Sequence, residues 1–383
     1  MIPRIAESEL LKLAAQFKAV AVTGPRQSGK TTLVSKAFPE KPYVNLENPD
    51  FRRFAIEDPR GFLSNYPEGA ILDEVQRTPE IFSYLQQILD ERNKPGMFVL
   101  TGSNNFLLQD NISQSLAGRV GYLFLLPLSI SEINSEEKPD ILIFKGGYPG
   151  LYNQEMDTPK FYLNYIRTYI ERDVRMVKNI TDLYAFEKFV RLCAGRIGQL
   201  LNLSNLATET GVDVKTISSW LSVLETSFIV FRLQPFYQNF NKRIVKMPKL
   251  YFYDTGLASA LLGMDNPSQL FLNPYRGNLF ENMIVVEMLK RRFNAGKRNN
   301  LFFWRDNTGN EIDLLIDNNN ELIPVEIKSG QTISSDSFKG LEFWQKIQKT
   351  ESTGYLVYAG DISQQRSNGM KVVPFKQLNL IKD

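Results

Sequence analysis

The segment with the clearest chemistry is residues 24–31, Gly-Pro-Arg-Gln-Ser-Gly-Lys-Thr, which matches the pattern G-x-x-x-x-G-K-[ST] at every fixed position. Glycines in such a loop let the backbone wrap closely around phosphate oxygens. The amide groups of the loop and of the following helix favour anions. The segment therefore predicts a binding site for a nucleoside triphosphate, with ATP as the expected ligand.

Each position of this loop has an expected role. Lys30 is expected to contact the β- and γ-phosphates, and the hydroxyl of Thr31 is expected to hold Mg²⁺. The predicted nucleotide-binding residues are Gly24, Pro25, Arg26, Gln27, Ser28, Gly29, Lys30, Thr31 and Thr32.

Polar side chains also end two later apolar runs. Asp73 and Glu74 close residues 69–74, and Ser103 and Asn104 follow residues 97–102. An aspartate after such a strand holds Mg²⁺ in P-loop enzymes, and the adjacent Glu74 is placed to polarise the attacking water. Ser103, with Asn104 as second choice, is expected to sense the γ-phosphate. The simpler alternatives are a solvated acid pair and an ordinary turn.

The elements that must position these residues alternate along the first 157 residues. Apolar runs at 19–24, 43–46, 69–74 and 97–103 predict strands, and helical patterns such as 79–92 lie between them. This alternation predicts a parallel sheet with helices on both faces. Ligands of such sheets bind at the carboxyl ends of the strands, where the polar residues stand.

A helix-turn-helix pattern follows in the middle of the chain. Ser204 is expected to cap its first helix, and Gly211 permits the tight turn. The second helix, at about 213–224, exposes Lys215. Strands at 228–233 and 249–253 enclose a basic loop, which predicts a winged helix. The exposed and basic residues of this region are Lys215, Thr216, Ser218, Ser219, Lys242, Arg243 and Lys246.

Charge is distributed unevenly and favours a polyanionic partner for this middle region. The net charge of the chain is only +3, yet residues 160–250 carry 14 basic and 7 acidic side chains. Basic wing residues on DNA phosphates are the functional interpretation. The alternative is a winged helix that packs only against the rest of the chain or against a protein partner.

The third group with chemical potential lies near the carboxyl end of the chain. Glu281 falls in a predicted helix at 279–293, Asp313 in a strand at 311–316, and Glu326 and Lys328 in a strand at 322–328. Glu326 and Lys328 face the same side because strand side chains alternate. Asp313 and Glu326 can hold a hard divalent cation that activates water, and Lys328 can position that water. The alternative is a charged strand pair without chemistry.

Several of these motifs resemble AAA+-type ATPases, and most closely a large prokaryotic family of uncharacterised predicted ATPases (AAA_14-like) followed by a DUF4143-like module of unknown function. The resemblance covers nearly the whole chain and includes residues 71–76, 100–103, 116–119 and 169–173. It implies that Arg119, or Arg172 as a second candidate, stabilises charge on the γ-phosphate in cis or across an interface.

The acidic group resembles the PD-(D/E)xK nuclease superfamily, since 13 positions separate Asp313 from Glu326 and Lys328 follows two residues later. The resemblance implies a metal-dependent nuclease, with Mg²⁺ or Mn²⁺ held by Asp313 and Glu326 and with Glu281 completing the acidic cluster. A nuclease fold that has lost its activity is the third interpretation.

Composition excludes other chemistries. The chain has no histidine, so no histidine-dependent triad or zinc site can form. A single cysteine, Cys193, excludes an internal disulfide. No apolar run approaches the roughly 20 residues that span a bilayer, and the first residues do not form a signal peptide. A cytoplasmic protein without a membrane partner is expected.

These observations predict an α/β fold in three parts: a P-loop ATPase domain at 1–157, a helical and winged-helix domain at 158–265, and a small nuclease-like α/β domain at 266–383. The first functional hypothesis is an ATPase that acts on DNA and carries a metal-dependent nuclease-like domain. The second is a regulatory ATP switch that binds DNA or protein without cutting. Assembly into a homo-oligomer is compatible with both.

Overall fold

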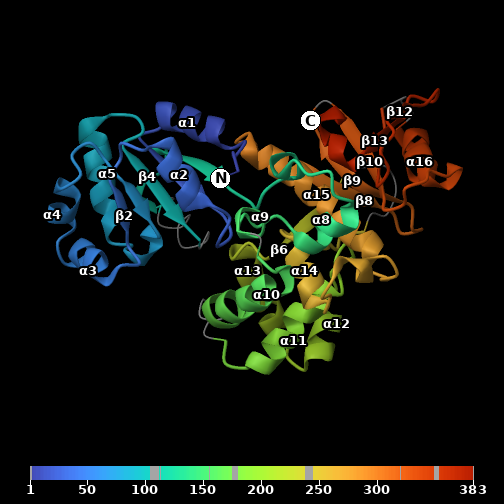
Figure 1. Cartoon of the computed structure of the whole chain (residues 1–383), viewed down its shortest axis with the longest axis horizontal. Coiled ribbons are helices and arrows are strands. Elements are labelled where there is room, and N and C mark those ends of the chain that lie inside the picture. Colours follow the sequence, from blue (N-terminus) through green and yellow to red (C-terminus); the bar gives the residue numbers. More distant parts are fainter. Residues whose placement is uncertain are drawn as a thin grey trace.

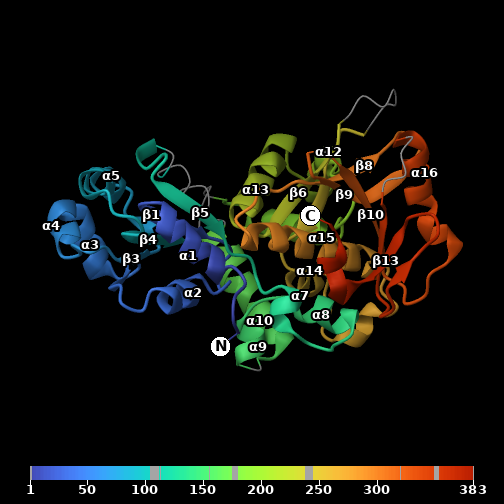
Figure 2. The ribbon, with the colours of Figure 1, turned by 90° about the horizontal axis from the view of Figure 1, so that it is seen from above.

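The structure is a computed structural model of the whole chain. It describes residues 2–103, 112, 114–154, 156–174, 180–237, 245–319, 321–348 and 353–382, without the side chains of 171–174. Two bodies are visible in Figure 1, one blue to cyan and the other green to red; Figure 2 shows the same division from above. No helix in the described part of the chain is long and apolar enough to span a bilayer.

The first body is built on a parallel sheet of five strands in the order β2-β3-β4-β1-β5. Four strands confirm the predicted apolar runs, while β5 was not among the predicted strands. Their bounds are β1 Ala19–Thr23, β2 Tyr43–Asn45, β3 Ile71–Asp73, β4 Phe98–Gly102 and β5 Val120–Phe124. Because β4 lies between β1 and β3, the carboxyl ends of all three strands meet at one edge of the sheet.

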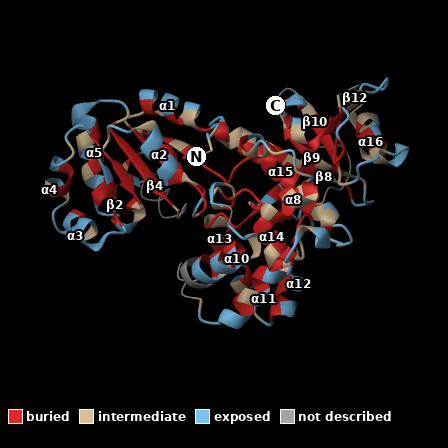
Figure 3. Ribbon diagram, viewed as in Figure 1, coloured by how far each residue is buried: buried red, intermediate tan, exposed pale blue. Residues whose placement is uncertain are grey.

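Helices cover both faces of this sheet, as the alternation of helices and strands predicts. Side chains of β1 alternate between two cores: Val20 and Val22 pack under α1 and α2, whereas Ala19 and Ala21 pack under α3, α4 and α5. Figure 3 shows the strands as buried and the outer helix faces as exposed. The bounds are α1 Glu7–Gln16, α2 Lys30–Ala37, α3 Pro49–Glu57, α4 Pro59–Ser64, η1 Val75–Arg77 and α5 Ile81–Arg92.

The second body begins with a series of helices. They are α7 Ile130–Ile133, α8 Pro139–Lys145, α9 Gly150–Asn153, α10 Thr158–Tyr165, η2 Ile166–Val174, α11 Leu183–Ala194, α12 Leu203–Thr210, α13 Val214–Thr226 and α14 Thr255–Leu261. Residues 131–139 are helical at their start, because Ser129 and Glu132 form a capping box for α7. Residues 142–151 belong to the core of this second body, although the predicted boundary was at 157.

The helix-turn-helix forms from α12 and α13, with Gly211 in the left-handed conformation (φ +82°) between them. The cap of α12 is Asn202, whose side chain accepts a hydrogen bond from the amide of Asn205. The prediction of Ser204 as the cap is therefore wrong, since the helix begins one residue before Ser204. Asp213 caps α13 through the amide of Thr216.

The strands after the helix-turn-helix do more than form a wing. β6 (Val230–Pro235) pairs antiparallel with β7 (Lys249–Phe252) and parallel with β8 (Leu301–Arg305). One sheet of eight strands results, in the order β12-β13-β11-β10-β9-β8-β6-β7. The remaining bounds are β9 Glu311–Asp317, β10 Leu322–Lys328, β11 Tyr355–Tyr358, β12 Gln364–Gln365, β13 Lys371–Pro374, η3 Pro267–Leu270, α15 Arg276–Asn294, η4 Ser335–Phe338, α16 Lys339–Gln348 and η5 Phe375–Leu380.

A buried arginine near the amino terminus joins the two bodies. The guanidinium of Arg4 donates to the carbonyl oxygens of Ser28 (2.7 Å) and Leu126 (2.7 Å) and to Oε1 of Glu132 (3.0 Å). The side chains of Arg4 and Glu132 are only 8% and 1% exposed. The phosphate loop is thus tied to the segment that leads into the second body.

We expect Arg4→Met to lower the free energy of unfolding by about 3–5 kcal/mol, because it leaves the carboxylate of Glu132 buried without its cation. Urea denaturation followed by circular dichroism measures the loss. Arg53→Met is the control, because its partner Asp50 and Arg53 itself are mostly exposed, and the expected loss there is below about 1 kcal/mol. Equal losses in both variants contradict a stabilising role of the Arg4 contacts.

Candidate functional site

The loop between β1 and α2 has the conformation expected of a phosphate-binding loop. Gly29 is left-handed (φ +92°) and directly precedes Lys30, the first residue of α2. The loop amides and the amino end of α2 lie at the edge where the strands end. Nζ of Lys30 donates to the carbonyl oxygens of Gly24 (3.0 Å) and Pro25 (2.8 Å) and is buried there.

Thr31 and Asp73, the predicted Mg²⁺ ligands, contact each other. Oγ1 of Thr31 donates to Oδ2 of Asp73 over 3.0 Å. The carboxylate of Asp73 also accepts from the hydroxyl of Tyr43 (2.5 Å) and from the hydroxyl of Thr101. A hydroxyl and a fixed carboxylate beside a phosphate loop are the hard oxygen donors that Mg²⁺ prefers, so this pair fits the metal that the motif implies.

Glu74 and Ser103, predicted to act on the attacking water and the γ-phosphate, are also brought together. Oγ of Ser103 donates to Oε2 of Glu74 over 3.2 Å, and the side-chain amide of Gln76 donates to the same oxygen. Glu74 itself is left-handed (φ +55°), which is uncommon for a residue with a side chain. Asn104, the second choice, lies outside the described residues.

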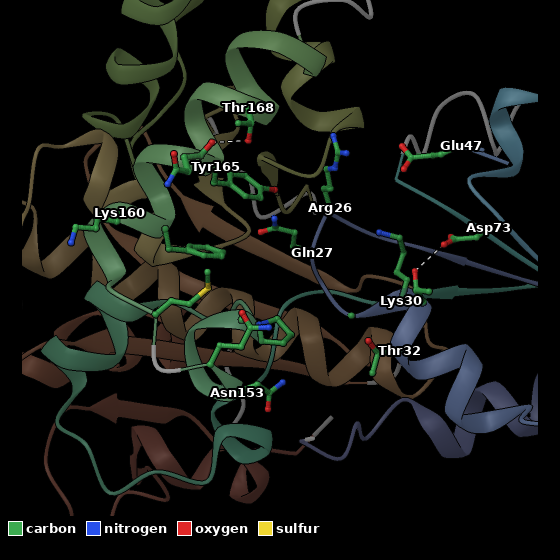
Figure 4. A pocket seen from close by; sticks show the side chains of 18 of the residues that line it. Arg26, Gln27, Lys30, Thr32, Glu47, Asp73, Asn153, Lys160, Tyr165 and Thr168 are labelled. Atoms are coloured by element: carbon green, nitrogen blue, oxygen red, sulfur yellow. Dashed lines mark hydrogen bonds between the residues drawn. The ribbon is translucent and has the colours of Figure 1, made fainter. Parts of the chain in front are cut away.

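Lys30, Thr31, Asp73 and Glu74 line one wall of a cleft of about 750 Å³, and the second body forms the other wall. Figure 4 shows Lys30, Asp73 and Thr32 on one side and Asn153, Lys160, Tyr165 and Thr168 on the other. The residues that sequence reasoning missed are of two kinds: Tyr43, Thr101 and Gln76, which hold Asp73 and Glu74, and Asn153, Lys160, Phe161, Tyr165 and Thr168 of the opposite wall. Gln76 and Thr101 lie in the segments 71–76 and 100–103 that carry the family resemblance, although no role was assigned to them there. No local motif marks the residues of the opposite wall.

Asp313, Glu326 and Lys328 do meet, as the strand pattern predicts. β9 and β10 are antiparallel neighbours, and Oδ2 of Asp313 accepts from the amide of Ile327 over 2.8 Å. Nζ of Lys328 lies 2.7 Å from Oε1 of Glu326 and 3.6 Å from Oδ2 of Asp313. Oε2 of Glu326 is buried without a hydrogen-bond partner. Burial and the neighbouring Asp313 raise the pKa of Glu326 to about 8.

Glu281 does not complete a metal site with these acids. Its Oε1 accepts from Nζ of Lys249 (2.9 Å) and from the hydroxyl of Tyr251 (2.5 Å), and Lys249 also pairs with Glu311. Among the described residues, no group of three or more acids is arranged to hold a metal ion. The prediction that Glu281 completes an acidic cluster with Asp313 and Glu326 is therefore corrected: its carboxylate is paired with the ammonium of Lys249.

Comparisons with known proteins divide the chain into three matched segments. The profile of an AAA domain matches residues 16–134, and profiles of two domains of unknown function, DUF8612 and DUF4143, match residues 136–268 and 276–378. An uncharacterized protein of Mycobacterium tuberculosis is 32% identical over 337 residues, which cover 86% of this chain and 75% of that protein. The chain belongs to the family of that protein.

A more distant relative is an uncharacterized protein of Methanocaldococcus jannaschii, 24% identical over 365 residues that cover 85% of this chain and 78% of that one. The chain is similar to the solved structure of the Walker-type ATPase of Pyrococcus abyssi, with 14% identity, a TM-score of 0.43, and coverage of 68% of this chain and 96% of that one. It is also similar to AMPPCP-bound DnaA of Aquifex aeolicus, with 15% identity, a TM-score of 0.30, and coverage of 58% of this chain and 86% of that one.

Within the AAA domain, Arg119 lies away from the phosphate loop. It directly precedes β5, at the amino-terminal edge of the parallel sheet, and its guanidinium contacts Asp90 of α5 at 2.6 and 2.7 Å. The in cis role predicted for Arg119 is therefore wrong, because the nucleotide cleft lies at the opposite edge. A role across an interface stays a prediction. The side chain of Arg172 lies outside the described residues.

The charge of Lys30 gives the AAA domain an expected pH dependence. Burial lowers the pKa of Lys30 to about 8, against the opposing effect of Glu74 and Asp73. Phosphates bind the ammonium form, so ATP affinity should fall as the pH rises above about 8, at most ~10-fold per pH unit, with uptake of a proton. Calorimetry between pH 7 and 9.5, in two buffers of different ionisation enthalpy, measures both effects.

Lys30→Arg serves as the control for this dependence, because a guanidinium keeps its proton throughout the range. The decline in affinity should disappear in that variant. An affinity of the wild-type protein that stays constant up to pH 9.5 contradicts the lowered pKa of Lys30.

Proposed function

We propose that this protein is an ATP-driven switch, which hydrolyses ATP in the cleft between its AAA domain and its helical body. The observation that carries the proposal is the composition of the cleft: one wall holds the phosphate loop with Thr31, Asp73 and Glu74, and the other belongs to α9 and α10. A nucleotide bound there contacts both bodies, so its hydrolysis changes the contacts between them.

The residues of the AAA domain have separate roles in this proposal. The loop amides and Lys30 bind the phosphates, and Thr31 and Asp73 hold Mg²⁺, which supplies charge neutralisation when bound. Tyr43 and Thr101 fix the carboxylate of Asp73 through their hydroxyl groups. Glu74 orients the attacking water from a position that Gln76 and Ser103 hold.

DNA is the proposed partner of the winged helix. Lys215 on α13 and Lys246 before β7 are exposed, while Lys242 and Arg243 lie outside the described residues. Thr216 and Ser219 are only partly exposed, and the hydroxyl of Thr216 donates a hydrogen bond to the carboxylate of Asp213. The exposed cations favour contacts to backbone phosphates over reading of bases.

A second candidate function is metal-dependent cleavage of phosphodiesters at Asp313, Glu326 and Lys328. One observation favours it: Oε2 of Glu326 is buried without a hydrogen-bond partner beside Asp313. Asp313 and Glu326 offer two carboxylates, so Mg²⁺ or Mn²⁺ bound there would keep several of its waters. The pairing of Glu281 with Lys249 favours the switch without cleavage.

Incubation of plasmid and branched DNA with Mg²⁺ or Mn²⁺, with and without ATP, separates the two functions. Glu326→Ala tests the candidate nuclease site, and Glu321→Ala is the control, because Glu321 pairs with Lys382 at the far end of the same strand region. Cutting that is lost only in Glu326→Ala supports the nuclease. ATP turnover and DNA binding without cutting support the switch, whereas absence of ATP turnover contradicts the main proposal.

A further inference from the structure

Arg26 is the arginine that the structure places in the nucleotide cleft. It is the third residue of the phosphate loop and lines the same space as Lys30, Asp73 and Glu74. Figure 4 shows Arg26 and Gln27 between Lys30 of the loop and Tyr165 of α10. Among the arginines of the described residues, Arg26 alone belongs to the lining of this cleft.

The guanidinium of Arg26 also contacts the second body. Its Cζ lies 5.9 Å from the centroid of the Tyr169 ring in η2. Tyr169 is buried, and its hydroxyl donates to the carbonyl oxygen of Ser227 over 3.2 Å. Ser227 is the C-cap residue of α13, the second helix of the helix-turn-helix. A single tyrosine therefore separates the phosphate loop from the end of that helix.

The contact with Tyr169 is weaker than the one that a phosphate offers. A cation over an aromatic ring gains about 0.5–2 kcal/mol, and a guanidinium on a phosphate forms charge-assisted, frequently bidentate hydrogen bonds. Arg26 stands in the loop expected to wrap the phosphates, and it lines the same cleft as Lys30.

We propose that Arg26 is a catalytic residue that contacts the γ-phosphate in cis, and that it exchanges the ring of Tyr169 for this phosphate when ATP binds. The inference rests on the proposed ATP hydrolysis, and it names Arg26 as the residue that offsets negative charge on the γ-phosphate during that reaction. It also specifies how the second body responds: the third phosphate removes a contact between the loop and η2, and its loss on hydrolysis restores that contact.

The test compares ATP with ADP. Arg26→Met should weaken the binding of MgATP by ~10-fold or more and lower kcat by ~100-fold or more, while the affinity for MgADP stays within about twofold. Arg26→Lys should recover part of the ATP preference, because it keeps the charge but not the fork of donors. Arg60→Met is the matched control. Arg60 lies on α4, outside the cleft, and its Cζ is 5.8 Å from the centroid of the Tyr84 ring.

The exchange itself is tested at Tyr169. Tyr169→Leu removes the ring that competes for Arg26, so the affinity for MgATP should rise about 2- to 5-fold while that for MgADP is unchanged; Tyr169→Phe keeps the ring and the wild-type affinities. Equal losses of ATP and ADP affinity in Arg26→Met, or a kcat equal to that of the wild type, overturn the inference alone. A wild-type protein that binds no ATP overturns the proposed function as well.

Discussion

Lys30→Ala is expected to weaken the binding of MgATP by ~100-fold or more and to abolish its hydrolysis, because it removes the buried ammonium expected to contact the β- and γ-phosphates. Among the described residues, the ammonium of Lys30 donates only to loop carbonyl oxygens, so the loop backbone should keep most of its stability without it. Calorimetric titration with MgATP measures the affinity.

Lys36→Ala is the control for this experiment, since Lys36 lies six residues further along α2 and forms a half-exposed ion pair with Glu7. Its affinity for MgATP should equal that of the wild type. Retained binding in Lys30→Ala contradicts the assignment of residues 24–31 as a nucleotide site.

Glu74→Gln is expected to lower kcat for ATP hydrolysis by ~100-fold or more without weakening MgATP binding, because the amide no longer accepts a proton from the attacking water. The substitution keeps an oxygen that can accept from Ser103 and Gln76, which hold the carboxylate in the structure. Release of phosphate under saturating ATP measures kcat, and the titration used for Lys30 measures binding.

Glu68→Gln, an exposed acid paired with Lys94 in the same domain, provides the comparison and should retain full activity. If Glu74→Gln hydrolyses ATP at the wild-type rate, another group activates the water. A variant that binds ATP without turnover is also the form in which DNA affinity is best measured.

The sequence predicted the phosphate loop because its chemistry is local: the strand, the two glycines and the helix start lie within 13 residues, Ala19 to Thr31. Asp73 and Ser103 could be predicted to lie near this loop, because the carboxyl ends of parallel strands meet at one edge of the sheet. The opposite wall of the cleft had no such signal. Lys160 and Phe161 reach it only through the packing of α10, which depends on contacts distant in sequence.

The acidic group shows the same limit. Alternation along one strand predicted that Glu326 and Lys328 face the same side. The resemblance implied that Asp313 belongs to the same group, and the antiparallel pairing of β9 with β10 brings it close to Lys328. The partner of Glu281, however, is Lys249, which lies 32 positions earlier on a strand assigned to another domain. Strand β5 was not predicted, because residues 122–128 form one apolar run that Pro127 interrupts.

The position of β6 has a consequence for how this chain can be divided. One edge of β6 is bonded to β7 and the other to β8, so the strand belongs to two domains defined from sequence at once. A fragment that begins near residue 266 exposes the backbone of β8 as an unpaired edge, which invites association with other strands. The winged helix and the carboxyl-terminal sheet should therefore be produced as one unit, because β6 belongs to both.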